Sequence, residues 1–75
     1  MEFPQFRKLK NGRSYYRIDA ANEFTELQQV GSKWLKYEFK VAQYPDKMLL
    51  QDMLQQQDPY LVVSAGEYQS ILEKI

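Results

Sequence analysis

Two of the residue types that carry most enzyme chemistry are missing: the 75-residue chain has no cysteine and no histidine. Without cysteine the chain forms no disulfide and presents no thiolate to a metal or a substrate. Without histidine it lacks the usual proton shuttle near neutral pH, and zinc, iron and copper lose their favoured ligands. The glycines Gly12, Gly31 and Gly66 are isolated rather than gathered in a phosphate-binding loop. We therefore expect no metal and no cofactor.

The chain also lacks long apolar runs and an excess of charge. Its aliphatic runs are short, as in Leu61-Val62-Val63, whereas a membrane helix needs about 20 apolar residues. The opening "MEFPQFRK" has an acidic residue and no apolar segment of a signal peptide, so a cytoplasmic location and no membrane partner are expected. Ten Lys and Arg residues balance ten Asp and Glu residues. Nucleic-acid-binding proteins usually show a clear basic excess, so nucleic acid is not expected as the main partner.

What the chain does have is apolar and aromatic content: 44% of its residues are hydrophobic, among them six tyrosines, four phenylalanines and one tryptophan. This suits a compact core. We predict one α+β domain over residues 1–75 with the order β-β-α-β-α-β-α. Its sheet is expected to be mainly antiparallel and four-stranded, with helices packed on one face, because each strand face and helix stripe needs one partner.

The N-terminal segment is predicted to form a hairpin around Asn11-Gly12, a dipeptide that suits a type I′ turn. A two-residue loop places Lys8 opposite Tyr15 and Leu9 on the face of Tyr16. A three-residue loop would instead put Leu9 beside Tyr15, so the hydrophobic pattern favours the two-residue register. The outward face of the hairpin then carries cations and aromatics together: Phe6, Lys8, Lys10, Arg13, Tyr15 and Arg17.

The middle of the chain is predicted to contain a helix and then a strand. Over residues 19–30, Asp19 or Asn22 can cap a helix, an apolar stripe includes Phe24 and Leu27, and Gly31 can end it. Residues 33–43 alternate in polarity, which is typical of a half-buried strand. On that strand Trp34 falls on the polar face.

The remaining elements are two helices and a short strand. Pro45 is expected to open a helix over 45–57, and Ser64 with Glu67 has the spacing of a capping box at the start of a helix over 65–75. A strand at 60–64 could pair in either direction. Both helices are expected to cover a single sheet face, formed by Leu9, Tyr16, Ile18, Leu35, Tyr37, Phe39 and Val41.

Three functional hypotheses follow. The first is a non-catalytic module that binds an unknown protein or self-associates as a homodimer, with Trp34, Tyr15 and Phe6 as candidate partner-binding residues, because aromatic side chains dominate interface anchors. The second is weak nucleic-acid binding through Lys8, Lys10, Arg13 and Arg17. The third is a carboxylate enzyme using Glu23 with Glu26, or Asp46 with Asp52. A domain this small has little room for a cleft that would raise one pKa, so no catalytic residue is assigned.

Overall fold

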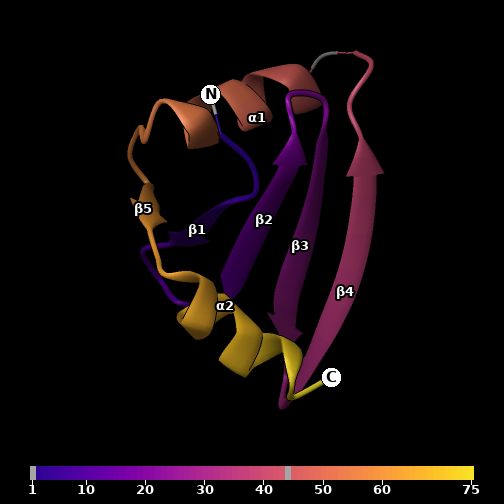
Figure 1. Cartoon of the computed structure of the whole chain (residues 1–75). Coiled ribbons are helices and arrows are strands. Elements are labelled where there is room, and N and C mark those ends of the chain that lie inside the picture. The colour runs from indigo at the N-terminus through magenta and orange to yellow at the C-terminus, as the bar shows by residue number, and fades with distance from the viewer. Residues whose placement is uncertain (1, 44) are drawn as a thin grey trace.

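The structure, a computed structural model, describes residues 2–43 and 45–75 and contains five strands and two helices (Figure 1). The elements in chain order are β1 (Gln5–Leu9), β2 (Ser14–Ala20), β3 (Glu23–Val30), β4 (Lys33–Lys40), α1 (Asp46–Leu54), β5 (Tyr60–Val62) and α2 (Ala65–Leu72).

All five strands belong to one antiparallel sheet with the order β4-β3-β2-β1-β5. The α+β class is confirmed, but the predicted four strands and the predicted order of elements are wrong. The strand at 60–64 had two possible directions, and β5 pairs antiparallel with β1. The two edges of the sheet differ in length, since β5 has three residues and β4 has eight.

The N-terminal hairpin has the predicted register and a different turn. Lys8 lies opposite Tyr15 and Phe6 opposite Arg17. The turn is closed by a hydrogen bond from the Gly12 N–H to the Leu9 carbonyl at 2.9 Å. Gly12 has φ +73°, whereas Asn11 does not have the positive φ that a type I′ turn requires. The register therefore follows from the hydrophobic pattern rather than from the predicted turn type.

The predicted helix over 19–30 is wrong, because this segment completes β2 and forms β3. Phe24 and Leu27 lie on one stripe of a helix, but in a strand they point to opposite faces. In the folded chain both faces are covered, and each of these side chains is at most 2% exposed. Of the two expected caps, Asp19 lies in β2 and Asn22 in the β2–β3 turn. Gly31, the expected stop, takes φ +62° in the β3–β4 turn.

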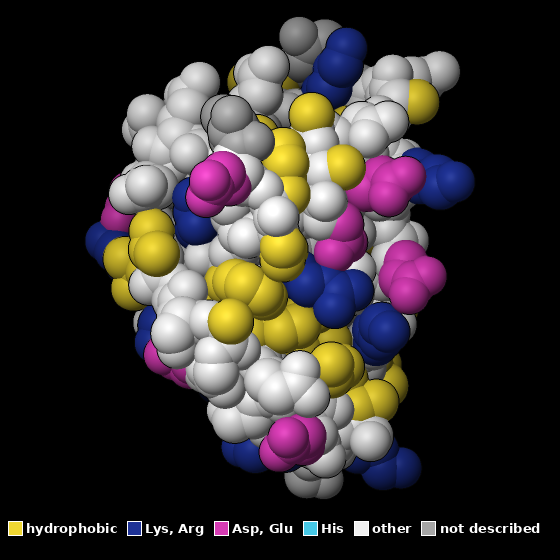
Figure 2. Space-filling model, in the orientation of Figure 1, with side chains coloured by type: hydrophobic (Ala, Val, Ile, Leu, Met, Phe, Trp, Pro, Cys, Tyr) yellow, Lys and Arg dark blue, Asp and Glu magenta, His cyan; other side chains and the backbone are white. Residues whose placement is uncertain are grey.

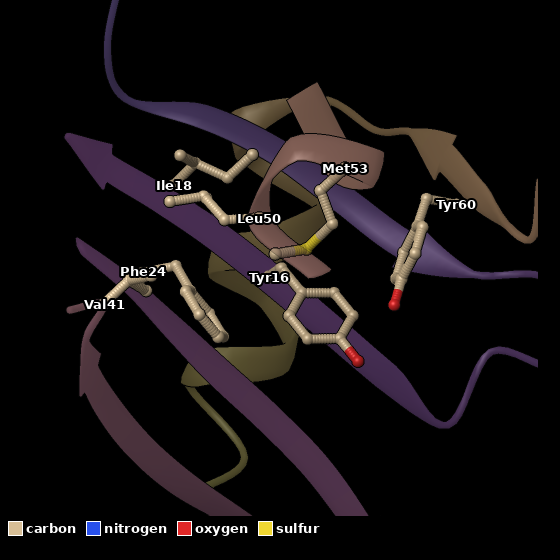
Figure 3. Packing of buried hydrophobic residues seen from close by; sticks show 7 residues of the cluster. All are labelled: Tyr16, Ile18, Phe24, Val41, Leu50, Met53 and Tyr60. Carbon is tan, nitrogen blue, oxygen red and sulfur yellow. The ribbon is translucent and has the colours of Figure 1, made fainter. Parts of the chain in front are cut away.

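The two helices pack on opposite faces of the sheet, so the predicted packing on one face is also wrong. We call the sides the α1 face and the α2 face. On the α1 face, Leu50 and Met53 of α1 pack against strand residues (Figure 3), and the cluster comprises Tyr16, Ile18, Phe24, Val41, Leu50, Met53 and Tyr60. On the α2 face the cluster comprises Tyr15, Leu27, Tyr68 and Ile71. The sheet is thus the middle of three layers.

Both helices are shorter than predicted. Pro45 occupies the N-cap position of α1 rather than its first turn, and α1 ends at Leu54. α2 ends at Leu72, and its predicted cap is present: Ser64 Oγ accepts a hydrogen bond from the Glu67 N–H at 3.1 Å. No helix in the described part of the chain is long and apolar enough to cross a membrane.

The cover that α1 provides is incomplete. Figure 1 shows α1 crossing the strands near the β2–β3 turn rather than running along them. A helix is about 10–12 Å wide, whereas a strand of eight residues is about 27 Å long. On β4, Phe39 is half-buried beside the cluster, but Leu35 is 39% and Tyr37 is 41% exposed. The prediction that helices cover Leu35 and Tyr37 is therefore wrong.

Candidate interaction surface

The three aromatic residues predicted to bind a partner all lie on the α2 face. Tyr15 is only 8% exposed and Phe6 is half-buried, with its ring 5.3 Å from that of Tyr68 on α2. Trp34 is half-buried and meets Tyr15 edge-on at 5.8 Å between ring centroids. Tyr15 and Phe6 thus contribute to the packing of α2. Trp34 packs against the same cluster from the edge strand β4.

Glu67 fixes α2 to the hairpin. Its Oε2 accepts hydrogen bonds from Tyr15 Oη at 3.1 Å and from Lys8 Nζ at 3.2 Å. Burial raises the pKa of Tyr15, and the hydrogen bond to Glu67 raises it further, because both disfavour the charged phenolate. In the predicted capping box the Glu67 carboxylate was expected to reach back to the Ser64 N–H. In the folded chain this carboxylate instead joins α2 to β1 and β2.

Carboxylates neutralise much of the basic surface that suggested nucleic-acid binding. Lys8 pairs with Glu67, Lys10 with Asp58, and Arg17 with Asp19. The fourth predicted cation, Arg13, is exposed at the hairpin turn. Figure 2 shows acidic and basic side chains around a shared apolar surface rather than a surface of one sign.

The aromatic rings among these cations are also occupied. Lys8 Nζ lies 6.0 Å from the centre of the Tyr15 ring, and the Arg17 guanidinium lies 5.7 Å from that of Tyr68. Stacking of nucleic-acid bases requires an exposed ring face. Tyr15 and Tyr68 are both buried, at 8% and 2% exposed, so neither offers such a face.

The carboxylate pairs considered for catalysis do not come together. Glu23 and Glu26 are three residues apart on β3 and therefore point to opposite faces of the sheet. Asp46 and Asp52 are six residues apart on α1, which is not a spacing that aligns side chains on one helix face. In the described part of the chain, no three metal-ligating side chains gather into a site that could hold an ion.

A polar hollow of about 380 Å³ lies beside β2, β3 and β4, and its lining residues are Arg17, Asp19, Glu23, Phe24, Thr25, Glu38, Phe39 and Lys40. One of its three acidic side chains, Asp19, is hydrogen-bonded within the protein. Asp19 Oδ1 accepts from Arg17 Nε at 2.5 Å, and Asp19 Oδ2 accepts from Thr25 Oγ1 at 2.9 Å. Both carboxylate oxygens of Asp19 are thus engaged by neighbouring side chains.

Sequence reasoning missed Arg7, a cationic residue that is only 4% exposed. Arg7 Nε donates to the Met53 carbonyl at 2.8 Å and Nη1 donates to the Phe6 carbonyl at 2.8 Å. The Met53 carbonyl lies in the last turn of α1, where the helix dipole favours a positive charge. Burial lowers the pKa of Arg7. The Arg7 side chain thus joins α1 to β1. The alternation of polar and apolar residues does not predict this role, because Arg7 is a charged residue on a buried face of the sheet.

The outer edge of β4 is the most accessible part of the sheet. The Val41 N–H donates to the Asn22 carbonyl at 2.7 Å, in line with the β3–β4 register. Because strand backbones alternate in direction, the odd residues of β4 direct their N–H and C=O groups toward β3. The even residues Trp34, Lys36, Glu38 and Lys40 direct theirs outward. Within the described residues this edge has no neighbouring strand.

Exposed apolar side chains accompany the unpaired backbone. Leu35 and Tyr37 lie next to this edge on the α1 face. Val30, at 52% exposed, lies on the same face at the end of β3, opposite Lys33. The alternation in residues 33–40 marks this strand as half-buried but cannot show which of its flanks is open. Comparison with family models, curated proteins and solved structures found no match.

Proposed function

We propose that this chain is a non-catalytic protein-interaction domain that binds a partner along the outer edge of β4. The observation that carries the proposal is the outer edge of β4, a strand of eight residues that pairs within the described residues only with β3. The exposed side chains of Leu35 and Tyr37 flank this edge. An exposed strand edge is a template on which a partner strand can add. Backbone hydrogen bonds then supply affinity, and the neighbouring side chains supply specificity.

The aromatic content of this edge supports the proposal. Tyr37 is exposed at one side of the strand and Trp34 is half-buried at the other, and Tyr and Trp are enriched among residues that dominate binding energy. The proposal keeps Trp34 from the three aromatic residues predicted to bind a partner. It replaces Tyr15 and Phe6, which pack against α2, with Leu35 and Tyr37.

The test places a photoreactive benzophenone amino acid at Leu35 and, as a matched control, at Leu61. Both positions are leucines with 39% exposure, but Leu61 lies on the opposite edge strand β5. Irradiation of cells that naturally produce this protein is expected to give covalent adducts with a partner from position 35 and not from position 61. Equal labelling at both positions, or none at position 35, would contradict binding at β4.

A second variant tests whether the backbone of β4 makes the contact. The Lys36 N–H faces outward, so Lys36→Pro removes a donor to a partner without removing a bond to β3. Proline is accepted on edge strands when its missing N–H faces solvent. We expect the adduct from position 35 to disappear in this variant while its circular dichroism spectrum is retained. Adducts that persist would assign binding to the side chains alone.

A further inference from the structure

We infer that the partner is a second copy of this chain, and that the two β4 strands pair antiparallel about a two-fold axis at Tyr37. This inference rests on the proposed function and names its partner. The inference rests on Lys36 and Glu38, which lie symmetrically on either side of Tyr37. Both direct their backbone N–H and C=O groups to the outer edge of β4, which has no neighbouring strand among the described residues.

The backbone restricts how two β4 strands can meet. Only the even residues of β4 direct N–H and C=O groups outward, as the Val41–Asn22 hydrogen bond and the β3–β4 register establish. Residues that exchange hydrogen bonds across an antiparallel pair lie directly opposite each other. In a symmetric pair, even residues must therefore face even residues, which leaves the axis at Leu35, Lys36, Tyr37, Glu38 or Phe39.

Charge selects among these registers. An axis at Lys36 places two lysines opposite each other, and an axis at Glu38 places two glutamates opposite each other, which is destabilising in both cases. Axes at Leu35 or Phe39 shorten the overlap between the strands. An axis at Tyr37 matches the strands over their length and places each Lys36 opposite Glu38 of the second copy.

The same register continues the apolar surface across the dimer. Leu35 faces Phe39 of the second copy, and the two Tyr37 side chains face each other on the α1 face. Phe39 stacks on the buried Phe24 at 4.8 Å between ring centroids. In the dimer the exposed Leu35 would therefore pack against Phe39 of the second copy, a residue that already contacts the core. On the α2 face, Trp34 faces Lys40 of the second copy, a pairing suited to a cation over an indole ring.

The charged side chains of β4 are available for this pairing. Lys36 Nζ lies 3.5 Å from Glu38 Oε1 of its own chain, and these side chains are 40% and 74% exposed. Lysines on an edge strand also discourage indiscriminate pairing. With the axis at Tyr37, Lys36 faces Glu38 of the second copy. With the axis at Lys36 or at Glu38, Lys36 would face a lysine instead, so this side chain favours the register centred on Tyr37.

The opposite edge does not compete as a partner for β4. β5 has three residues, too few to match a strand of eight. Pairing of β4 with β5 of another copy would moreover leave free edges at both ends and generate an open chain of molecules, whereas pairing of β4 with itself closes as a dimer.

An interface of one strand pair is smaller than the standard of about 800 Å² per partner, so weak, micromolar association is expected.

The first arm of the test exchanges charges and follows mass by sedimentation velocity from about 1 µM to 1 mM, the range that weak association requires. Lys36→Glu alone and Glu38→Lys alone each place like charges opposite each other twice, and each is expected to weaken the dimer roughly tenfold or more. Mixing the two single variants is expected to give a heterodimer, because the two acidic side chains of one chain then face the two lysines of the other. The double variant Lys36→Glu, Glu38→Lys restores the homodimer. Association unaffected by the single variants would overturn the register.

The second arm uses the absence of cysteine from the chain. At the axis, two residues of a non-hydrogen-bonded pair have Cα atoms about 4.5 Å apart, within the 4.4–6.8 Å range of disulfides. Tyr37→Cys is therefore expected to form a disulfide-linked dimer on mild oxidation. Leu35→Cys is the control, with similar exposure on the same face but about 14 Å from its copy. Linkage at position 35 but not at position 37 would refute the axis.

The outcomes separate this inference from the proposed function. A chain that stays monomeric at about 1 mM, with a photoadduct from position 35 that contains a different protein, overturns the homodimer and leaves binding at β4 standing. A photoadduct of twice the chain's mass, with the disulfide at position 37, supports both. A chain that stays monomeric and gives no adduct specific to position 35 overturns both.

Discussion

The hydroxyl of Tyr68 offers a sharp test of how α2 is held. Tyr68 is 2% exposed, and its Oη has no hydrogen-bond partner in the described part of the chain. Burial raises the pKa of this hydroxyl. The ring packs on Phe6 and beneath the Arg17 guanidinium. The ring therefore stabilises the fold, while the hydroxyl is buried without a hydrogen-bond partner among residues 2–43 and 45–75.

We predict that Tyr68→Phe raises the free energy of unfolding by about 1 kcal/mol. The substitution keeps the ring and removes a buried polar group whose unsatisfied burial costs about 1–3 kcal/mol. Tyr15→Phe is the matched control in the same cluster. Its hydroxyl donates to Glu67 at 3.1 Å, so its removal should lower the free energy of unfolding by about 1–2 kcal/mol. One chemical change at two neighbouring tyrosines thus has opposite expected signs.

The assay is urea denaturation followed by far-ultraviolet circular dichroism, with wild type and both variants in parallel. For 75 residues the total stability is expected to be about 4–11 kcal/mol, so a change of 1 kcal/mol is readily measured. It also shifts the melting temperature by about 4–8 °C. A loss of more than about 0.5 kcal/mol in Tyr68→Phe, at an unchanged denaturant slope, would show that this hydroxyl has a partner and would refute the reasoning.

Three further outcomes are expected. Ile71→Ala, at a site 8% exposed, should lower the free energy of unfolding by about 2–4 kcal/mol in urea; a change below about 1 kcal/mol would mean that α2 is not part of the cooperative fold. Burial, and to a smaller extent the negative charge of Glu26, raises the pKa of Tyr16. The contribution of Tyr16 to the free energy of unfolding is therefore complete below about pH 10 and is lost as pH rises further. Tyr16→Phe should therefore reduce the alkaline fall in stability by about 1.4 kcal/mol per pH unit; an unchanged slope would argue against the raised pKa. In fluorescence anisotropy at about 150 mM salt, single-stranded DNA should not bind saturably; micromolar binding lost in a folded Lys8→Glu, Arg17→Glu variant would contradict this.

The features that the sequence predicted are those set by neighbouring residues. The register of the first hairpin follows from one apolar face with Tyr16 and Ile18, and a shift by one residue would turn these side chains away from the α1 face. The start of α2 follows from Ser64, whose side chain accepts from a backbone N–H three residues ahead. Both features depend on contacts within a few residues of the chain.

Residues 19–30 could not be assigned in the same way because their local signals fit two structures. Asn22 and Gly31 suit the ends of a helix and also the turns of two hairpins. Phe24 and Leu27 form a stripe in a helix but lie on opposite faces in β3. The strand is stable because α1 and α2 provide apolar surface on both sides, and those helices lie more than fifteen residues further along the chain. The decisive contacts are therefore tertiary, and they override the local preference.

The candidate site depends on the same long-range arrangement. Alternation over residues 33–40 identifies Leu35, Tyr37 and Phe39 as one apolar face but gives no indication of which will be covered. The position of α1 decides this, because the cluster that contains Leu50 and Met53 of α1 packs against Phe39 and leaves Leu35 exposed. It is also decided by the strand order, which leaves β4 at an edge. A central position for β4 would have satisfied its outward backbone groups and removed the reason for binding. The proposed function therefore arises from what the fold leaves unpaired, and it became visible only when the order of the strands and the reach of α1 were known.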